Sequence, residues 1–155
     1  MNCLLIFIGT LLITISSAFA QVTSQDLDII KDVFQKEKRS IVKEYIDLPE
    51  AESKKFWVIY KDYEADSKIL IDRRVSNIKR YNSMHESLTP EAIDAIVEEG
   101  FELDKLRLKI DKTYYKRISK EISPKTAIRF MQIEDFLTTS VLSELYKNIP
   151  FVSSN

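Results

Sequence analysis

His85 is the only histidine in this 155-residue chain, and its imidazole has the widest range of chemistry among the side chains present. An imidazole serves as a metal ligand or as a general base near neutral pH. A zinc site needs several histidine or cysteine ligands, and here it would have to recruit Met84, Glu86 or acids from elsewhere in the chain. We therefore expect no metal site, with His85 as a weak candidate only, and a partly buried or solvated imidazole at a helix end.

Three carboxylates, Glu98, Glu99 and Glu102, lie close together in the sequence and form an acidic patch. Paired carboxylates perform acid–base catalysis only in a cleft that shifts their pKa values apart. On an exposed helix they are solvated surface, which general burial preferences favour. The sequence also lacks a serine on a glycine-flanked turn and a glycine-rich phosphate loop. We expect no catalytic residues, no cofactor and no enzymatic activity.

An aromatic group with helical spacing follows two lysines: Lys54, Lys55, Phe56, Trp57, Tyr60 and Tyr63. Aromatic side chains dominate protein cores and protein interfaces alike, so the pattern allows two interpretations. The favoured interpretation is core packing with the phenol groups reaching solvent. The alternative is an exposed aromatic and basic surface that binds another protein, because a thin helical hairpin cannot bury all its large apolar side chains.

Prolines mark the starts of the elements that would carry these residues. Pro49, Pro90 and Pro124 each stand where the first turn of a helix tolerates a missing N–H, and Thr89 and Ser123 are suited to cap the last two helices. Apolar residues then recur at spacings of three and four, and the chain contains only two glycines. The pattern predicts four helices, over about 24–45, 49–86, 90–121 and 124–148.

The second of these helices would be about 57 Å long, which exceeds the diameter of a compact domain of this size. Its apolar spacing favours a coiled-coil-like antiparallel pairing with the third helix, through a turn at 87–90. The stripes expected to be buried include Ile93 and Gly100 on the third helix and Phe130 and Phe136 on the fourth. We predict an all-α fold, an elongated antiparallel helical hairpin with flanking N- and C-terminal helices, in a single domain over 21–155.

The first twenty residues contain no charged side chain and end in Ala18-Phe19-Ala20, the pattern that a signal peptidase cleaves. We expect residues 1–20 to be a removed signal peptide and the protein to be periplasmic or secreted. The only cysteine, Cys3, lies in this segment, so the remaining chain would fold without a disulfide.

The 23 basic and 24 acidic residues give a net charge of −1, which provides no long-range field for a polyanion. We expect no nucleic-acid partner and no stable membrane insertion after cleavage. The expected partners are other proteins, with a second copy of the chain among them.

Two segments carry a resemblance to known proteins. The first is the aromatic group, which follows a Pro-Glu-Ala helix start at 49–51, and the second reads Pro124-Lys125-x-Ala127-x-Arg129-Phe130-x-Gln132-x-Glu134. Together they resemble a family of uncharacterised exported helical proteins of Gram-negative bacteria, distantly similar to the Spy/CpxP group of periplasmic chaperones and metal sensors. The resemblance implies a structural brace in the last helix, in which Arg129, with Gln132 and Glu134 on adjacent turns, would reach a carboxylate on a neighbouring helix.

The composition and the resemblance lead to one expectation about function. We expect an exported, non-enzymatic helical protein that binds other polypeptides, as an envelope-stress chaperone or accessory protein. One alternative is a periplasmic sensor that responds to a ligand or metal and regulates a membrane-bound signalling protein. Another is a structural component of the envelope.

Overall fold

A computed structural model describes residues 23–147 and 149–152 of the chain, and the segment expected to be a signal peptide lies outside the described residues. The described part is all-α. Its four helices are α1 (Ser24–Tyr45), α2 (Glu50–Met84), α3 (Pro90–Glu121) and α4 (Pro124–Tyr146). The observed bounds differ from the expected ones by one or two residues, at the start of α2 and at the ends of α2 and α4.

Side-chain caps fix the starts of three helices. The Thr23 hydroxyl accepts a hydrogen bond from the Asp26 backbone N–H, and the Asp26 carboxylate accepts one from the Thr23 N–H, which completes a capping box. Thr89 caps α3 and Ser123 caps α4 through the hydroxyl alone, which accepts from the backbone N–H three residues on, and each is followed by proline at the first helical position. Since proline has no N–H to satisfy, these starts leave fewer unpaired donors.

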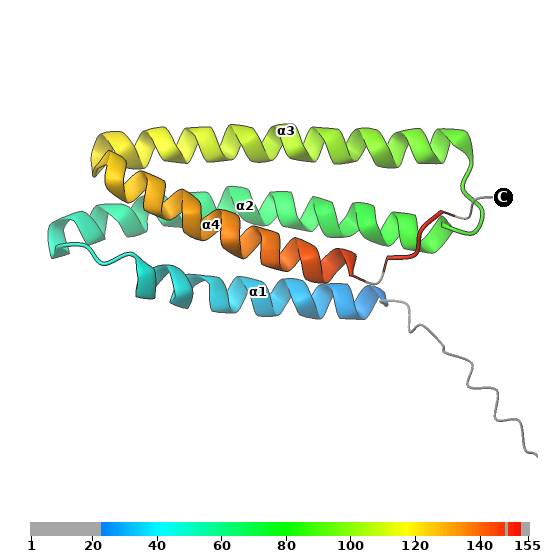
Figure 1. Cartoon of the computed structure of the whole chain (residues 1–155), viewed down its shortest axis with the longest axis horizontal. Coiled ribbons are helices and arrows are strands. Elements are labelled where there is room, and N and C mark those ends of the chain that lie inside the picture. The colour runs from blue at the N-terminus through cyan, green and yellow to red at the C-terminus, as the bar shows by residue number, and fades with distance from the viewer. Residues whose placement is uncertain (1–22, 148, 153–155) are drawn as a thin grey trace, which may run out of the picture.

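The helices run antiparallel to their neighbours in the chain, so that α1 and α3 point one way and α2 and α4 the other (Figure 1). Helix α2 packs on α3, α3 on α4, and α1 on both α4 and α2. The α2 and α3 helices, with 35 and 32 residues, are about 52 and 48 Å long. The flanking helices α1 and α4 thus lie along the α2–α3 pair and share its core.

The core consists of two clusters of buried apolar side chains along the length of the helices. One cluster is rich in aromatic rings and includes Phe56, Tyr60, Tyr63, Tyr114 and Phe130; the other is aliphatic and includes Leu27, Ile71, Val75, Val141 and Leu145. Within the aromatic cluster, the rings of Tyr63 and Phe130 meet edge to face with centroids 5.0 Å apart. Such pairs add specificity to the apolar burial that stabilises the bundle.

None of the helices in the described part of the chain is long and apolar enough to cross a membrane.

Candidate functional site

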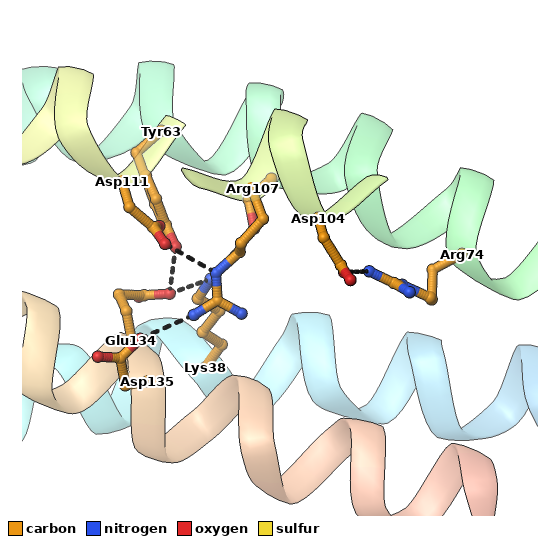
Figure 2. A network of polar contacts seen from close by, with 9 residues as sticks. Lys38, Tyr63, Arg74, Asp104, Arg107, Asp111, Glu134 and Asp135 are labelled. Carbon is orange, nitrogen blue, oxygen red and sulfur yellow. Dashed lines mark hydrogen bonds and ion pairs between the residues drawn. The ribbon is translucent and has the colours of Figure 1, made fainter. Parts of the chain in front are cut away.

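A buried ion pair joins the first helix to the last. The Lys38 ammonium of α1 lies 2.6 Å from Glu134 Oε2 of α4, and the two side chains are 6% and 0% exposed. The Tyr63 hydroxyl of α2 donates a hydrogen bond to the same carboxylate oxygen at 2.7 Å, and the ammonium also stands over the Tyr63 ring, 4.7 Å from its centroid. Figure 2 shows the three side chains converging from three helices.

The electrostatics of Glu134 follow from this enclosure. Burial raises the pKa of the Glu134 carboxyl, while Lys38 and the Tyr63 hydroxyl act in the opposite direction and offset part of that rise. The second oxygen, Oε1, is buried and has no hydrogen-bond partner in the described structure. Because an unpartnered buried acceptor costs free energy, the carboxylate depends on the two donors that meet at Oε2.

A second charged group, centred on Arg107 of α3, continues the polar network (Figure 2). Its guanidinium donates to Asp111 Oδ2 at 3.0 Å on the same helix and to Asp135 Oδ1 at 2.8 Å on α4. Burial raises the pKa of Asp111, and the nearby Arg107 lowers it in part. Arg107 therefore bridges α3 to α4 beside the position at which Glu134 bridges α4 to α1.

Further along the bundle, Arg74 of α2 pairs with Asp104 of α3, with 2.5 Å between guanidinium nitrogen and carboxylate oxygen. A cavity of about 80 Å³ lies between this pair and Arg107. Its walls include Tyr63 and Ile110 of the aromatic cluster and Ile71 and Val141 of the aliphatic cluster, so it marks the junction of the two halves of the core. Its size and its mixed lining suit a few water molecules.

This network has the geometry of a brace. Each of its cations, Lys38, Arg107 and Arg74, faces a carboxylate on another helix. Breaking one partner of a buried pair leaves a charge that the apolar surroundings cannot solvate, so a shifted helix register is strongly penalised. The arrangement therefore favours one alignment of the four helices.

The structure corrects the idea of an exposed aromatic surface. Phe56, Tyr60 and Tyr63 are buried in the core, so these three cannot form a protein-binding surface in the folded chain. Trp57 is partly buried, and Arg39 of α1 stands 5.1 Å from its ring centroid. Lys54 and Lys55 are exposed, with Lys54 paired to Glu50 on its own helix. The aromatic rings face inward because the flanking helices α1 and α4 cover the α2–α3 pair.

The last-helix brace also differs from its expected form. Arg129 and Gln132 are exposed, and within the described residues no carboxylate lies at ion-pair distance from Arg129. Glu134 is the buried member of the three, and its cation comes from Lys38 on α1. The expected arginine contact is therefore wrong, because Arg129 faces away from the core.

His85 caps the C-terminal end of α2, where its Nδ1 lies 2.9 Å from the Asn82 carbonyl oxygen. In residues 23–147 and 149–152 no three histidine, cysteine or acidic side chains are grouped as a metal site would require. The acidic patch separates into two unrelated contacts. Glu99 forms a bidentate pair with Arg73 of α2, and Glu102 pairs with Lys105 one turn further along α3.

The outer face of α4 carries a feature that the sequence analysis missed. Six exposed residues recur there at spacings of three and four, and none of them is charged: Ile128, Gln132, Phe136, Thr139, Ser143 and Tyr146. Phe136 is 70% exposed, whereas the sequence stripe had placed it in the core. The buried row of α4 begins with Thr126, Ala127 and Phe130. The signal in the sequence was a second row of apolar and neutral residues on another side of the same helix.

The chain matches no protein family model, and comparisons with curated proteins and with solved structures also found no match.

Proposed function

We propose that this protein is an exported, non-enzymatic helical protein that binds other polypeptides in the manner of a chaperone or accessory protein. The uncharged outer face of α4, defined by the six residues from Ile128 to Tyr146, is the binding surface of this proposal. Its ligand is an apolar or aromatic segment of another polypeptide chain. The 70% exposure of Phe136 is the observation that carries the proposal.

The position of Phe136 supports this assignment. A phenylalanine is usually buried, and this one stands at the centre of a row without any charged side chain in a protein where 30% of residues are charged. Charged groups lose hydration when a partner covers them, so a neutral row lowers the cost of binding an apolar segment. Thr139 and Ser143 beside it offer hydroxyl groups that adapt to different ligands.

The spacing of the row supports binding along a helix or an extended segment. Positions at steps of three and four stay on one side of an α-helix, so the row follows α4 over most of its length. Ile128 stands near the start of the helix, and Tyr146, whose hydroxyl accepts a hydrogen bond from Arg74 of α2, stands at its end. A long, shallow and mostly neutral surface of this kind suits weak, adaptable contacts with several partners.

The proposed location follows from residues 1–20. If they are removed after export, the mature N-terminus is Gln21, three residues before α1 begins at Ser24. N-terminal sequencing of protein recovered from an expressing bacterium tests this. An intact N-terminus in the cytosolic fraction would contradict the proposed location.

A pair of double variants tests the proposed surface. Ile128→Ser with Phe136→Ser removes the apolar side chains of the α4 face, and Val58→Ser with Ile69→Ser removes two similarly exposed ones from the outer side of α2. We expect the full-length protein and the α2 variant to slow aggregation of a heat-unfolded test protein, and the α4 variant to lose most of this effect. Circular dichroism must show the same helicity for all three.

Two results would overturn the proposal. One is the absence of any protection by the unaltered protein at several-fold molar excess. The other is an equal loss of protection in the α2 and α4 variants. That result would show that any exposed apolar side chain protects the test protein, whichever helix carries it.

A further inference from the structure

Helix α3 carries a row of charged residues that changes sign at its middle. The row follows spacings of three and four, so it keeps to one side of the helix. All its members are exposed. The first half is acidic, with Glu91, Asp94, Glu98 and Glu102, and the second half is basic, with Lys105, Lys109, Lys112, Lys116 and Lys120.

These charges have almost no partners within the chain. Among residues 23–147 and 149–152, the only ion pair that a member of the row makes is the contact between Glu102 and Lys105 at its centre. Charged side chains on the other side of α3 are paired across helices, as Glu99 is with Arg73 and Asp104 with Arg74. The row is therefore free to meet charges outside the folded chain.

An exposed apolar stripe runs along α3 beside the charged row. It consists of Ile93, Val97, Phe101, Leu108 and Tyr115, and the two central members, Phe101 and Leu108, are 54% and 53% exposed. Leu103, Ile110 and Tyr114 form the separate, buried face of the same helix. Figure 1 shows α3 along one edge of the bundle, with no other helix on its outer side. An apolar stripe flanked by charges is the pattern of a helix that pairs with a further helix.

We propose that a second copy of this chain docks on this face, with the two α3 helices antiparallel about a twofold axis near Asp104. A row on one side of an apolar seam meets the same row of its partner only when the helices are antiparallel. The acidic half of each copy then lies against the basic half of the other. Glu102, Glu98, Asp94 and Glu91 of one copy come opposite Lys105, Lys109, Lys112 and Lys116 of the second copy.

Two pairs of positions beside the charged row are centred on Asp104, about half a residue from the centre of the opposing charges. Ile93 and Tyr115 are each eleven positions from Asp104, and Gly100 and Leu108 are each four positions from it. In the antiparallel pair, Ile93 therefore meets Tyr115 and Leu108 meets Gly100 of the second copy. The charge pairs and these two contacts are therefore compatible with one antiparallel alignment.

Gly100 gives a third reason to expect a partner here. Glycine in the middle of a helix is destabilising, and a Cβ added to Gly100 would have no atom within 4 Å. The folded monomer therefore gives no packing reason for this glycine. A helix that packs against its backbone does give one, because a residue without a side chain leaves room for the Leu108 side chain of a second copy.

The lysines could alternatively hold a polyanion, since four of them line a shallow hollow around Leu108. That ligand would leave the four acids of the row unexplained and would be repelled by them. The second copy accounts for both halves of the row. This inference is independent of the proposed function, which rests on α4.

Charge reversal provides the test, with the oligomeric state measured by sedimentation velocity over a range of concentrations. Asp94→Lys with Glu98→Lys makes the row predominantly basic, and Lys109→Glu with Lys112→Glu makes it predominantly acidic. We expect each variant alone to dimerise at least about tenfold more weakly than the unaltered chain, because attraction becomes repulsion on both sides of the axis. An equimolar mixture should recover a heterodimer.

A matched control uses Lys55→Glu with Lys61→Glu, which reverses two exposed lysines on α2 and should leave the dimer unchanged. Orientation is tested by disulfide formation in the full chain with Cys3→Ser. Lys105→Cys, near the axis, should cross-link to its own copy, and Asp94→Cys, far from the axis, should not. Cross-linking of the second variant would contradict the proposed antiparallel register, in which residue 94 lies far from its own copy.

Three results would overturn the inference. The first is a monomer at every concentration reached. The second is a dimer whose dissociation constant is the same in the α3 and α2 reversals. The third is failure of the two α3 variants to associate when mixed, with helicity retained in both. If a polyanion such as heparin binds the unaltered monomer through the lysines and no dimer forms, the α3 face is a polyanion-binding surface and not a dimer interface.

Discussion

Lys38 and Glu134 face each other across the interior of the bundle, with 2.6 Å between ammonium nitrogen and carboxylate oxygen and almost no exposure of either side chain. They connect the first helix to the last, and Tyr63 attaches the second helix to the same oxygen. Removing either charge should destabilise the fold, because the other charge would then be buried without a counter-ion.

The first prediction concerns the removal of one partner. Lys38→Met or Glu134→Gln alone should lower the free energy of unfolding by about 3–5 kcal/mol, since each leaves an uncompensated buried charge. The double variant should be less destabilised than the sum of the two, because no charge remains and the amide introduced by Glu134→Gln can still accept from the Tyr63 hydroxyl. Urea denaturation followed by circular dichroism measures all three, and additive losses would contradict the coupling.

The second prediction concerns alkaline pH. Burial raises the pKa of Tyr60, Tyr63 and Tyr114 above the ordinary value of 10.0, with Glu134 adding to the effect at the first two and Asp66 at the third. The unfolded chain loses these protons above pH 10 while the folded chain keeps them. Their contribution to stability is therefore present below pH 10 and is lost as the pH rises further.

We expect these three phenols to ionise together with the loss of helicity, as tyrosinate absorbance and circular dichroism would record. Tyr60→Phe should remove one part of that late absorbance change. It should not destabilise the fold, because the Tyr60 hydroxyl is buried without a hydrogen-bond partner. Ionisation of all tyrosines before any loss of helicity would be inconsistent with the buried positions.

The third prediction concerns the corner between α3 and α4. The Ser123 hydroxyl accepts from the Thr126 backbone N–H at 3.1 Å, which satisfies one of the free donors at the start of α4. Ser123→Ala should lower stability by about 1 kcal/mol, as is typical of a lost N-cap. Ser143→Ala, at an exposed position inside α4, should leave stability unchanged or slightly increased. Equal effects at both positions would show that Ser123 has no capping role.

The fourth prediction separates the stability of the monomer from the association of two copies. Gly100→Ala should raise the free energy of unfolding of the monomer by about 0.5–1 kcal/mol, because the helix gains a better helix former and nothing obstructs the new Cβ. The same change should weaken the proposed dimer, since the methyl group would occupy the space for Leu108. Thermal unfolding and sedimentation of one sample measure both effects, and a Gly100→Ala dimer of undiminished strength would argue against this contact.

Much of the secondary structure could be read from local chemistry. Thr89 with Pro90 and Ser123 with Pro124 are start signals that act within a single turn, and the structure has helices at both places. The last turns were less predictable. Helix α2 ends at Met84, before the expected residue 86, because Ser87 N–H bonds back to the Met84 carbonyl and turns the chain.

The site was harder to predict because it depends on contacts between distant residues. Lys38 lies between Phe34 and Val42 on the core side of α1, and Glu134 lies between Phe130 and Leu137 on the core side of α4. Opposite charges on two apolar faces were the available signal. The sequence does not say which helix faces which, so it could not distinguish Lys38 from Arg129 as the partner of Glu134.

The sequence also predicted only in part which sides of α3 and α4 are buried. Ile93 and Phe136 were expected in the core because their spacing is compatible with the buried stripes, yet both are exposed. A helix with two apolar rows has no single inward direction, and the choice between the rows is made by packing against other helices. The rows left outside on α3 and α4 are the surfaces for which we propose partners.

The ion pair between α1 and α4 also bears on how the chain is made. A growing polypeptide presents Lys38 before Glu134, and α2 and α3 emerge between the two. Until then the ammonium has no buried counter-ion, and its burial against the α2–α3 pair would be costly. We therefore expect the four helices to close only after α4 has been made, because α4 carries the counter-ion of Lys38.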